Sequence, residues 1–145
     1  MQDQTAFTRQ TVLASAIAIL LVIPCYFLGG VAVMIYFFFH HIGGGFDFGF
    51  SWIPFLNGLL KILWEMVVPE IIRGIVTGYT ALAITMKIFP TANESNVIFA
   101  ASFTWGTILV IMMGISALML GINQQLPQTL ILAASLFAGC KLFQS

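Results

Sequence analysis

The chain has 145 residues, of which 60% are hydrophobic and only 7% are charged, and its five basic and five acidic residues cancel. A soluble protein carries roughly 25% charged residues and must present much of its surface to water, so this composition argues against a soluble globular fold. The zero net charge and the lack of a basic run also argue against nucleic acid as a partner.

Apolar segments of the length that spans a bilayer recur along the chain. A membrane-spanning helix requires about 20 mostly apolar residues. Four candidate segments lie at residues 11–39, 70–89, 97–120 and 128–142, and the last of them is short for a span. The stretches between them are polar or turn-forming, with Pro90 and Gly121 at positions where helices commonly stop. The sequence therefore predicts an all-α membrane protein with four transmembrane helices in a single domain.

The first of these segments is longer than one bilayer crossing requires. Residues 11–39 would rise about 43 Å as a helix, against a hydrocarbon core of about 30 Å. The segment contains Pro24 and the pair Gly29–Gly30, and an internal proline removes a helix hydrogen bond and commonly kinks the axis. We expect a kinked or strongly tilted helix whose end reaches an aromatic membrane interface or another protein.

Paired histidines follow this segment, in the stretch HHIGGGFDFGFSW at residues 40–52. His40 and His41 are candidate ligands for a haem, a metal or a quinone. Adjacent helical residues point about 100° apart, so these two cannot sandwich one iron, and the chain has no third histidine. The glycines and aromatic residues after them are typical of a helix end at the membrane interface. We therefore expect no bound cofactor and no metal.

A polar stripe marks the next segment, residues 52–68. Asn57, Lys61 and Glu65 recur every four residues, so they share one face of a helix whose other side is apolar. A charge at the centre of a bilayer costs about 2.5–3.5 kcal/mol on insertion scales. We therefore predict an interfacial amphipathic helix over 52–68, ended by Pro69 before the second span begins.

The start of the second predicted span carries charged and small residues on shared faces. Glu70 and Arg73 lie three apart, either as an ion pair within the membrane or with both side chains reaching headgroups or water. Gly74, Gly78 and Ala81 follow on one face, and small residues let helices approach closely. This face serves either packing inside the bundle or contact with another chain, and we take these five residues as candidate partner contacts.

Catalytic residues are not predicted, because the sequence lacks a nucleophile–base pair, a phosphate-binding loop and a zinc-protease motif. We predict a small non-catalytic subunit or scaffold of a larger membrane complex, with the lipid bilayer and other membrane subunits or copies of itself as partners. One alternative is a small oligomeric transporter or channel with Glu70 and Arg73 near its path. Another is a redox-complex subunit that contributes His40 or His41 to a haem or quinone site.

Basic residues near helix ends indicate orientation, because cytoplasmic loops carry an excess of them. In a four-span arrangement Arg9, Lys87 and Lys141 fall on one side, and Lys61 and Arg73 fall on the other. This distribution places both termini in the cytoplasm, and we expect the protein in a cell inner membrane.

Overall fold

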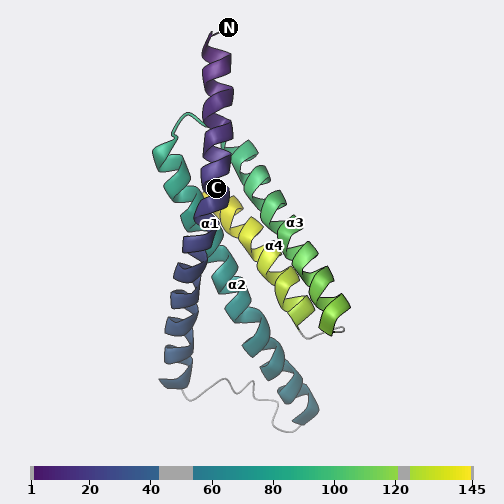
Figure 1. The fold of residues 1–145 in the computed structure, drawn as a ribbon. Coiled ribbons are helices and arrows are strands. Elements are labelled where there is room, and N and C mark those ends of the chain that lie inside the picture. The colour runs from purple at the N-terminus through teal and green to yellow at the C-terminus, as the bar shows by residue number, and fades with distance from the viewer. Residues whose placement is uncertain (1, 43–53, 121–124, 145) are drawn as a thin grey trace.

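The computed structural model describes residues 2–42, 54–120 and 125–144, and in these ranges the chain forms four α-helices and no strand. The helices are α1 (Gln2–Ile42), α2 (Pro54–Ile88), α3 (Glu94–Leu120) and α4 (Gln125–Gln144). Consecutive helices run in opposite directions, so that α1 and α3 descend and α2 and α4 ascend in the view of Figure 1. The predicted all-α class is confirmed.

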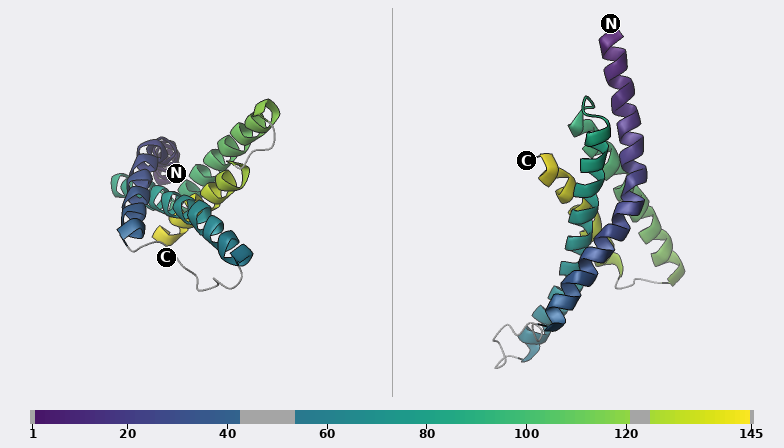
Figure 2. Two further views of the ribbon diagram at one scale, coloured as in Figure 1. Left: turned by 90° about the horizontal axis from the view of Figure 1, so that it is seen from below. Right: turned by 90° about the vertical axis from the view of Figure 1, so that its left-hand side faces the viewer.

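Helix α1 is longer than the sequence predicts. It begins at Gln2 rather than near residue 11, and its 41 residues include Pro24. The polar first turns belong to the same helix, and their hydroxyls are bonded to helix carbonyls, as when Thr11 Oγ1 donates to the Phe7 carbonyl oxygen at 3.0 Å. The axis of α1 changes direction in its middle part (Figure 2), as expected for a helix that loses a hydrogen bond at an internal proline.

Helix α2 shows that the predicted separation at Pro69 is wrong. The sequence predicts an interfacial helix over 52–68 that ends at this proline, whereas Pro54–Ile88 is one helix of 35 residues that passes through it. Proline removes one backbone hydrogen bond but leaves the others in place, so a helix that packs against neighbours on both sides of the residue can continue. Pro69 itself is buried, and α2 packs chiefly against α4 and α1.

Helices α3 and α4 begin and end close to the predicted boundaries. Asn93 precedes α3, and its side-chain oxygen accepts from the Asn96 backbone N–H at 3.3 Å, which is the usual role of an N-cap asparagine. α3 packs against α1 and α4 and has little contact with α2. The sequence therefore places these two helices correctly.

The core is built mostly from small side chains contributed by all four helices. Its members are Ala14, Ala18, Val22 and Cys25 of α1, Ala81 and Leu82 of α2, Val97, Ile98 and Ala101 of α3, and Leu136 and Cys140 of α4, with Ala92 from the α2–α3 connection. Thr77 and Thr85 are also fully buried, and their hydroxyls donate to carbonyl oxygens one turn earlier in α2, at 2.6 and 2.8 Å. Small residues and internally bonded threonines let the helices approach closely.

The outer faces of α1 and α3 are strongly apolar. Two helical segments of the described chain, Phe7–His40 and Glu94–Met119, are long and apolar enough to cross a membrane, and only 11% of an apolar 18-residue stretch of α3 is buried. Exposed large side chains include Phe27, Met34 and Leu118. Because these side chains are exposed, the apolar faces of the two helices point away from the bundle. A core helix of a soluble protein would hide such a surface.

Candidate functional site

The crossing of α1 and α2 sets the position of the candidate site. A Cβ atom at Gly29 would lie 2.7 Å from the Arg73 carbonyl oxygen and 2.8 Å from Thr77 Oγ1. On the same side, Thr77 Oγ1 lies 3.4 Å from the Cys25 carbonyl oxygen. The missing side chain at Gly29 thus lets the two backbones approach, and it brings Tyr26 of α1 beside Arg73 of α2.

Arg73 has two partners in this crossing. Its Nη1 donates to Glu70 Oε1 at 3.3 Å and to the Tyr26 hydroxyl at 3.1 Å. The side chains of Arg73 and Glu70 are 25% and 15% exposed, so the pair is shielded from solvent on most sides. The ion pair that the spacing of Glu70 and Arg73 allows is therefore formed, and a tyrosine that the sequence did not suggest completes it.

A pocket opens at this ion pair between α1, α2 and α4. It has a volume of about 230 Å³ and is lined by Tyr26, Glu70, Arg73, Gln128, Thr129 and Leu132. We call it the polar pocket. Gln128 and Thr129 lie near the start of α4, so the pocket lies close to the end of the bundle at which α4 begins.

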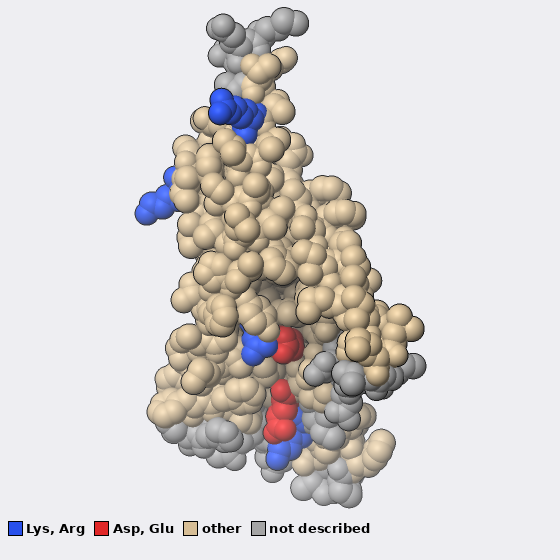
Figure 3. Space-filling model, viewed as in Figure 1, with Lys and Arg blue, Asp and Glu red and all other residues tan. Residues whose placement is uncertain are grey.

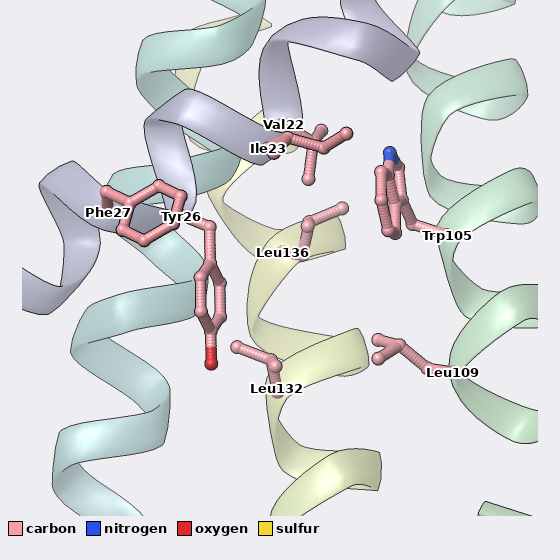
Figure 4. A pocket seen from close by; sticks show the side chains of 8 residues that line it. All are labelled: Val22, Ile23, Tyr26, Phe27, Trp105, Leu109, Leu132 and Leu136. Carbon is pink, nitrogen blue, oxygen red and sulfur yellow. The ribbon is translucent and has the colours of Figure 1, made fainter. Parts of the chain in front are cut away.

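An apolar groove lies beside the polar pocket, between α1, α3 and α4. Its volume is about 260 Å³, and it is lined by Val22, Ile23, Tyr26, Phe27, Trp105, Leu109, Leu132 and Leu136 (Figure 4). The indole Nε1 of Trp105 donates to the Ile19 carbonyl oxygen at 2.8 Å, so the polar atom of this ring is satisfied by α1. Tyr26 and Leu132 line both the groove and the polar pocket. The two spaces therefore share a wall.

The space-filling view places charge beside a hollow. Neighbouring basic and acidic side chains lie at the lower edge of a hollow in the face of the molecule (Figure 3). In the upper and middle part of this face most atoms belong to uncharged residues. The charged side chains in this part of the face thus form a compact pair of opposite sign.

The predicted small-residue face of α2 lies against α4 of the same chain. A Cβ at Gly74 would meet Ser135 and would lie 2.9 Å from the Leu136 backbone nitrogen, and one at Gly78 would lie 3.0 Å from the Cys140 nitrogen. Ala81, one turn further along, is 3% exposed. This is the packing alternative that the sequence left open. A contact of the same face with another chain stays a prediction.

The part that α4 plays in this contact was only partly visible in the sequence. Gly139 of α4 approaches Ile75 so closely that an added Cβ would lie 2.8 Å from the Ile75 Cα. The four-residue spacing of Ser135 and Gly139 marks a small face on α4, but nothing in a single sequence pairs it with Gly74 and Gly78. The parallel direction of α2 and α4 then brings the two small faces together over two turns.

His40, the candidate histidine whose side chain the structure describes, is not among the residues that line the polar pocket. The His40 ring stacks on the Tyr36 ring of the same helix, with centroids 5.8 Å apart and an interplanar angle of 22°. The His41 side chain falls outside the described residues. Over the described part of the chain, no group of three or more His, Cys, Asp or Glu side chains could hold a metal ion. Ligation of a haem or a quinone by these histidines stays a prediction.

No known protein family, no curated protein and no solved structure matches this chain. The features of the structure that bear on function are the outer apolar faces of α1 and α3, the polar pocket and the apolar groove.

Proposed function

We propose that the protein is a small non-catalytic subunit of a larger membrane complex, inserted through all four helices. The outward apolar faces of α1 and α3 carry this proposal, because only 11% of an apolar 18-residue stretch of α3 is buried. Large contiguous apolar patches on a soluble monomer lead to association. A bilayer is a solvent in which the same faces are stable.

Polar groups gather at two levels of the bundle, which suits the two faces of a membrane. At one level the Thr11 hydroxyl accepts from the Asn93 backbone N–H at 3.1 Å, and Gln144 donates to Ser95 at 3.1 Å. The other level holds the polar pocket. Helix α2 rises about 22 Å from Arg73 to its last residue at 1.5 Å per residue. Polar side chains at the two levels can reach outward, which brings the distance between their polar ends closer to the hydrocarbon thickness of about 30 Å.

The lower ends of α1 and α2 extend further than the lower ends of α3 and α4 (Figure 1). On α1 this extension exposes Met34, Phe38 and Phe39, and on α2 the Lys61 and Glu65 side chains are exposed. Aromatic side chains and methionine are enriched at the core of protein interfaces, and the rim of such interfaces is polar. We assign this extension, named here the α1–α2 extension (residues 34–40 and 54–65), to contact with another membrane subunit.

The membrane assignment is specific enough to test on its own. In the proposed arrangement both termini are cytoplasmic in a cell inner membrane, and the chain resists extraction with alkaline carbonate. Release of the chain into the carbonate supernatant would contradict membrane insertion and with it the proposed function.

The partner contact is tested by replacing two matched pairs of exposed phenylalanines with alanine, one pair at a time. The tagged chain is purified from its host in mild detergent, and co-purified chains are quantified relative to the membrane level of the bait. Phe38→Ala with Phe39→Ala should reduce a stoichiometric partner. Phe99→Ala with Phe103→Ala, equally exposed on α3, should not. Equal loss from both pairs, or no stoichiometric chain with the wild type, contradicts the subunit assignment. Ion or solute flux by the isolated chain in vesicles favours the transporter.

A further inference from the structure

We propose that the polar pocket and the apolar groove together bind one zwitterionic phospholipid whose headgroup carries a primary ammonium. The phosphate lies at Arg73, the ammonium at Glu70, and one acyl chain lies in the groove past Tyr26. This inference rests on the membrane insertion proposed above and is independent of any partner subunit.

The groove fits a hydrocarbon chain because its walls offer no free polar group. Six of its eight lining side chains are aliphatic or phenyl. The other two, Trp105 and Tyr26, have their polar atoms bonded to the Ile19 carbonyl and to Arg73. A polar ligand would lose its hydrogen bonds to water in this space without replacement. An acyl chain loses none and removes apolar surface from contact with water or detergent.

The polar pocket fits a zwitterion better than a single charge. Arg73 and Glu70 cancel each other at 3.3 Å, so a lone anion or a lone cation would leave one unpaired charge in a shielded site. A zwitterion gives each side chain an opposite partner, and hydrogen bonds between charged groups are the strong ones. Arg73 Nε has no hydrogen-bond partner among the described residues, so Glu70 and Tyr26 do not use all donors of the guanidinium.

The connection between the two spaces matches a molecule with a polar head and an apolar tail. Tyr26 and Leu132 line both spaces, and Figure 4 shows the Tyr26 hydroxyl beside Leu132 at one end of the groove. Gln128 and Thr129 extend the polar lining near the start of α4. The pocket thus lies near the end of the bundle, where a headgroup of the surrounding leaflet can reach it.

The experiment compares three phospholipids on the delipidated, detergent-solubilised chain. Native mass spectrometry measures the retention of dioleoyl phosphatidylethanolamine, phosphatidylcholine and phosphatidylglycerol. We expect one phosphatidylethanolamine molecule to bind about tenfold more tightly than either of the others, the equivalent of about 1.4 kcal/mol. The choline headgroup cannot donate a hydrogen bond to Glu70, and the glycerol headgroup has no cation. Equal retention of all three lipids overturns the proposal, and so does preference for phosphatidylglycerol.

Variants of each half of the site locate the bound lipid. Arg73→Gln and Glu70→Gln should each remove the preference for phosphatidylethanolamine, whereas Lys87→Gln, outside the pocket, should keep it. Leu109→Trp fills the groove and should lower retention, whereas Leu118→Trp, on the same helix and 89% exposed, should not.

A folding failure in the charge variants does not leave the proposal open. Monodispersity and helix content are measured for each variant. If Arg73→Gln unfolds the chain, the lipid preference of the wild type still tests the proposal. The comparison of Leu109→Trp with Leu118→Trp tests it as well. Unchanged retention in Leu109→Trp contradicts a chain in the groove. Because lipid binding uses the isolated chain, its failure is distinct from the loss of a partner in cells.

Discussion

Small and hydroxyl-bearing residues determine how closely these helices pack. Gly29 lets the backbone of α2 approach α1 closely, and Gly74 and Gly78 do the same for α4 against α2. On α4, Gly139 lets the backbone of α2 approach. Thr77 is fully buried between α1 and α2, yet its hydroxyl is bonded within its own helix at 2.6 Å. Polar atoms that bond locally add no unpaired donor to the interface, so the close contacts cost little desolvation.

The first prediction contrasts two glycines that differ only in their surroundings. Gly78→Ala should destabilise the protein by about 1–3 kcal/mol, because the new methyl group meets the Leu136 carbonyl and the Cys140 nitrogen and forces a shift of packed backbone. Gly114→Ala on α3, where nothing lies within 4 Å of an added Cβ, should stabilise by about 0.5–1 kcal/mol. Thermal unfolding in mild detergent measures both changes. A neutral or stabilising effect of Gly78→Ala would contradict the intramolecular role of Gly78.

The candidate site was only half visible in the sequence. The spacing of Glu70 and Arg73 predicts their pairing because both lie on one helix face. Tyr26 lies 47 residues from Arg73, and Trp105 lies on a third helix, so no local pattern joins them to the ion pair. A single sequence fixes neighbours along a helix, whereas neighbours between helices depend on crossing positions such as Gly29.

At the scale of elements, the long apolar segments predicted where the helices lie better than the prolines predicted where the helices end. The predicted spans at 97–120 and 128–142 fall inside α3 and α4. Pro69 was expected to end a helix, and α2 instead passes through it. Proline at a helix start and proline inside a packed helix look alike in sequence, because the difference is made by the neighbouring helices. The position of residues 54–68 relative to a bilayer stays a prediction.

Helix α3 is joined to α1 by a hydrogen bond of the Trp105 side chain. Trp105→Phe keeps an aromatic ring but deletes the bond to the Ile19 carbonyl oxygen, a loss of about 0.5–1.5 kcal/mol. We expect spin labels at Leu20 and Ile111 to show a broader distance distribution between α1 and α3. Both positions are exposed, so the labels leave the core intact.

Two controls show whether this loosening is confined to α3. Labels at Ile84 and Leu142 report the α2–α4 contact, which the Trp105→Phe variant should leave unchanged. Phe103→Leu changes an exposed ring on α3 and should leave both distance distributions unchanged. Equal broadening of the two pairs would mean that Trp105 supports the whole bundle.

At the scale of the whole molecule, two parallel pairs of helices interlock. Contacts of Gly74 with Ser135 and of Gly78 with Cys140 advance together along α2 and α4. Hydrogen bonds from Asn93 to Thr11 and from Trp105 to Ile19 advance together along α3 and α1. Each pair joins elements that are not consecutive in the chain, so the bundle cannot separate into an N-terminal and a C-terminal hairpin without breaking both pairs. The four helices should therefore unfold as one unit.

The alternation of helix direction yields the final prediction, which concerns topology. Four helices that alternate in direction bring the start of α1 and the end of α4 to the same side (Figure 1). If all four cross the membrane, a cysteine at Gln4 and one at Ser145 should react with an impermeant maleimide from the cytoplasm. A cysteine at Asp47, between α1 and α2, should react from the other side. The background is Cys25→Ala with Cys140→Ala, because both native thiols are free and buried. Asp47 and Ser145 lie outside the described residues, so these labels report on sidedness alone. Reaction at position 47 from the same side as position 4 would mean that α1 does not cross the membrane, and the four-span arrangement would then be wrong.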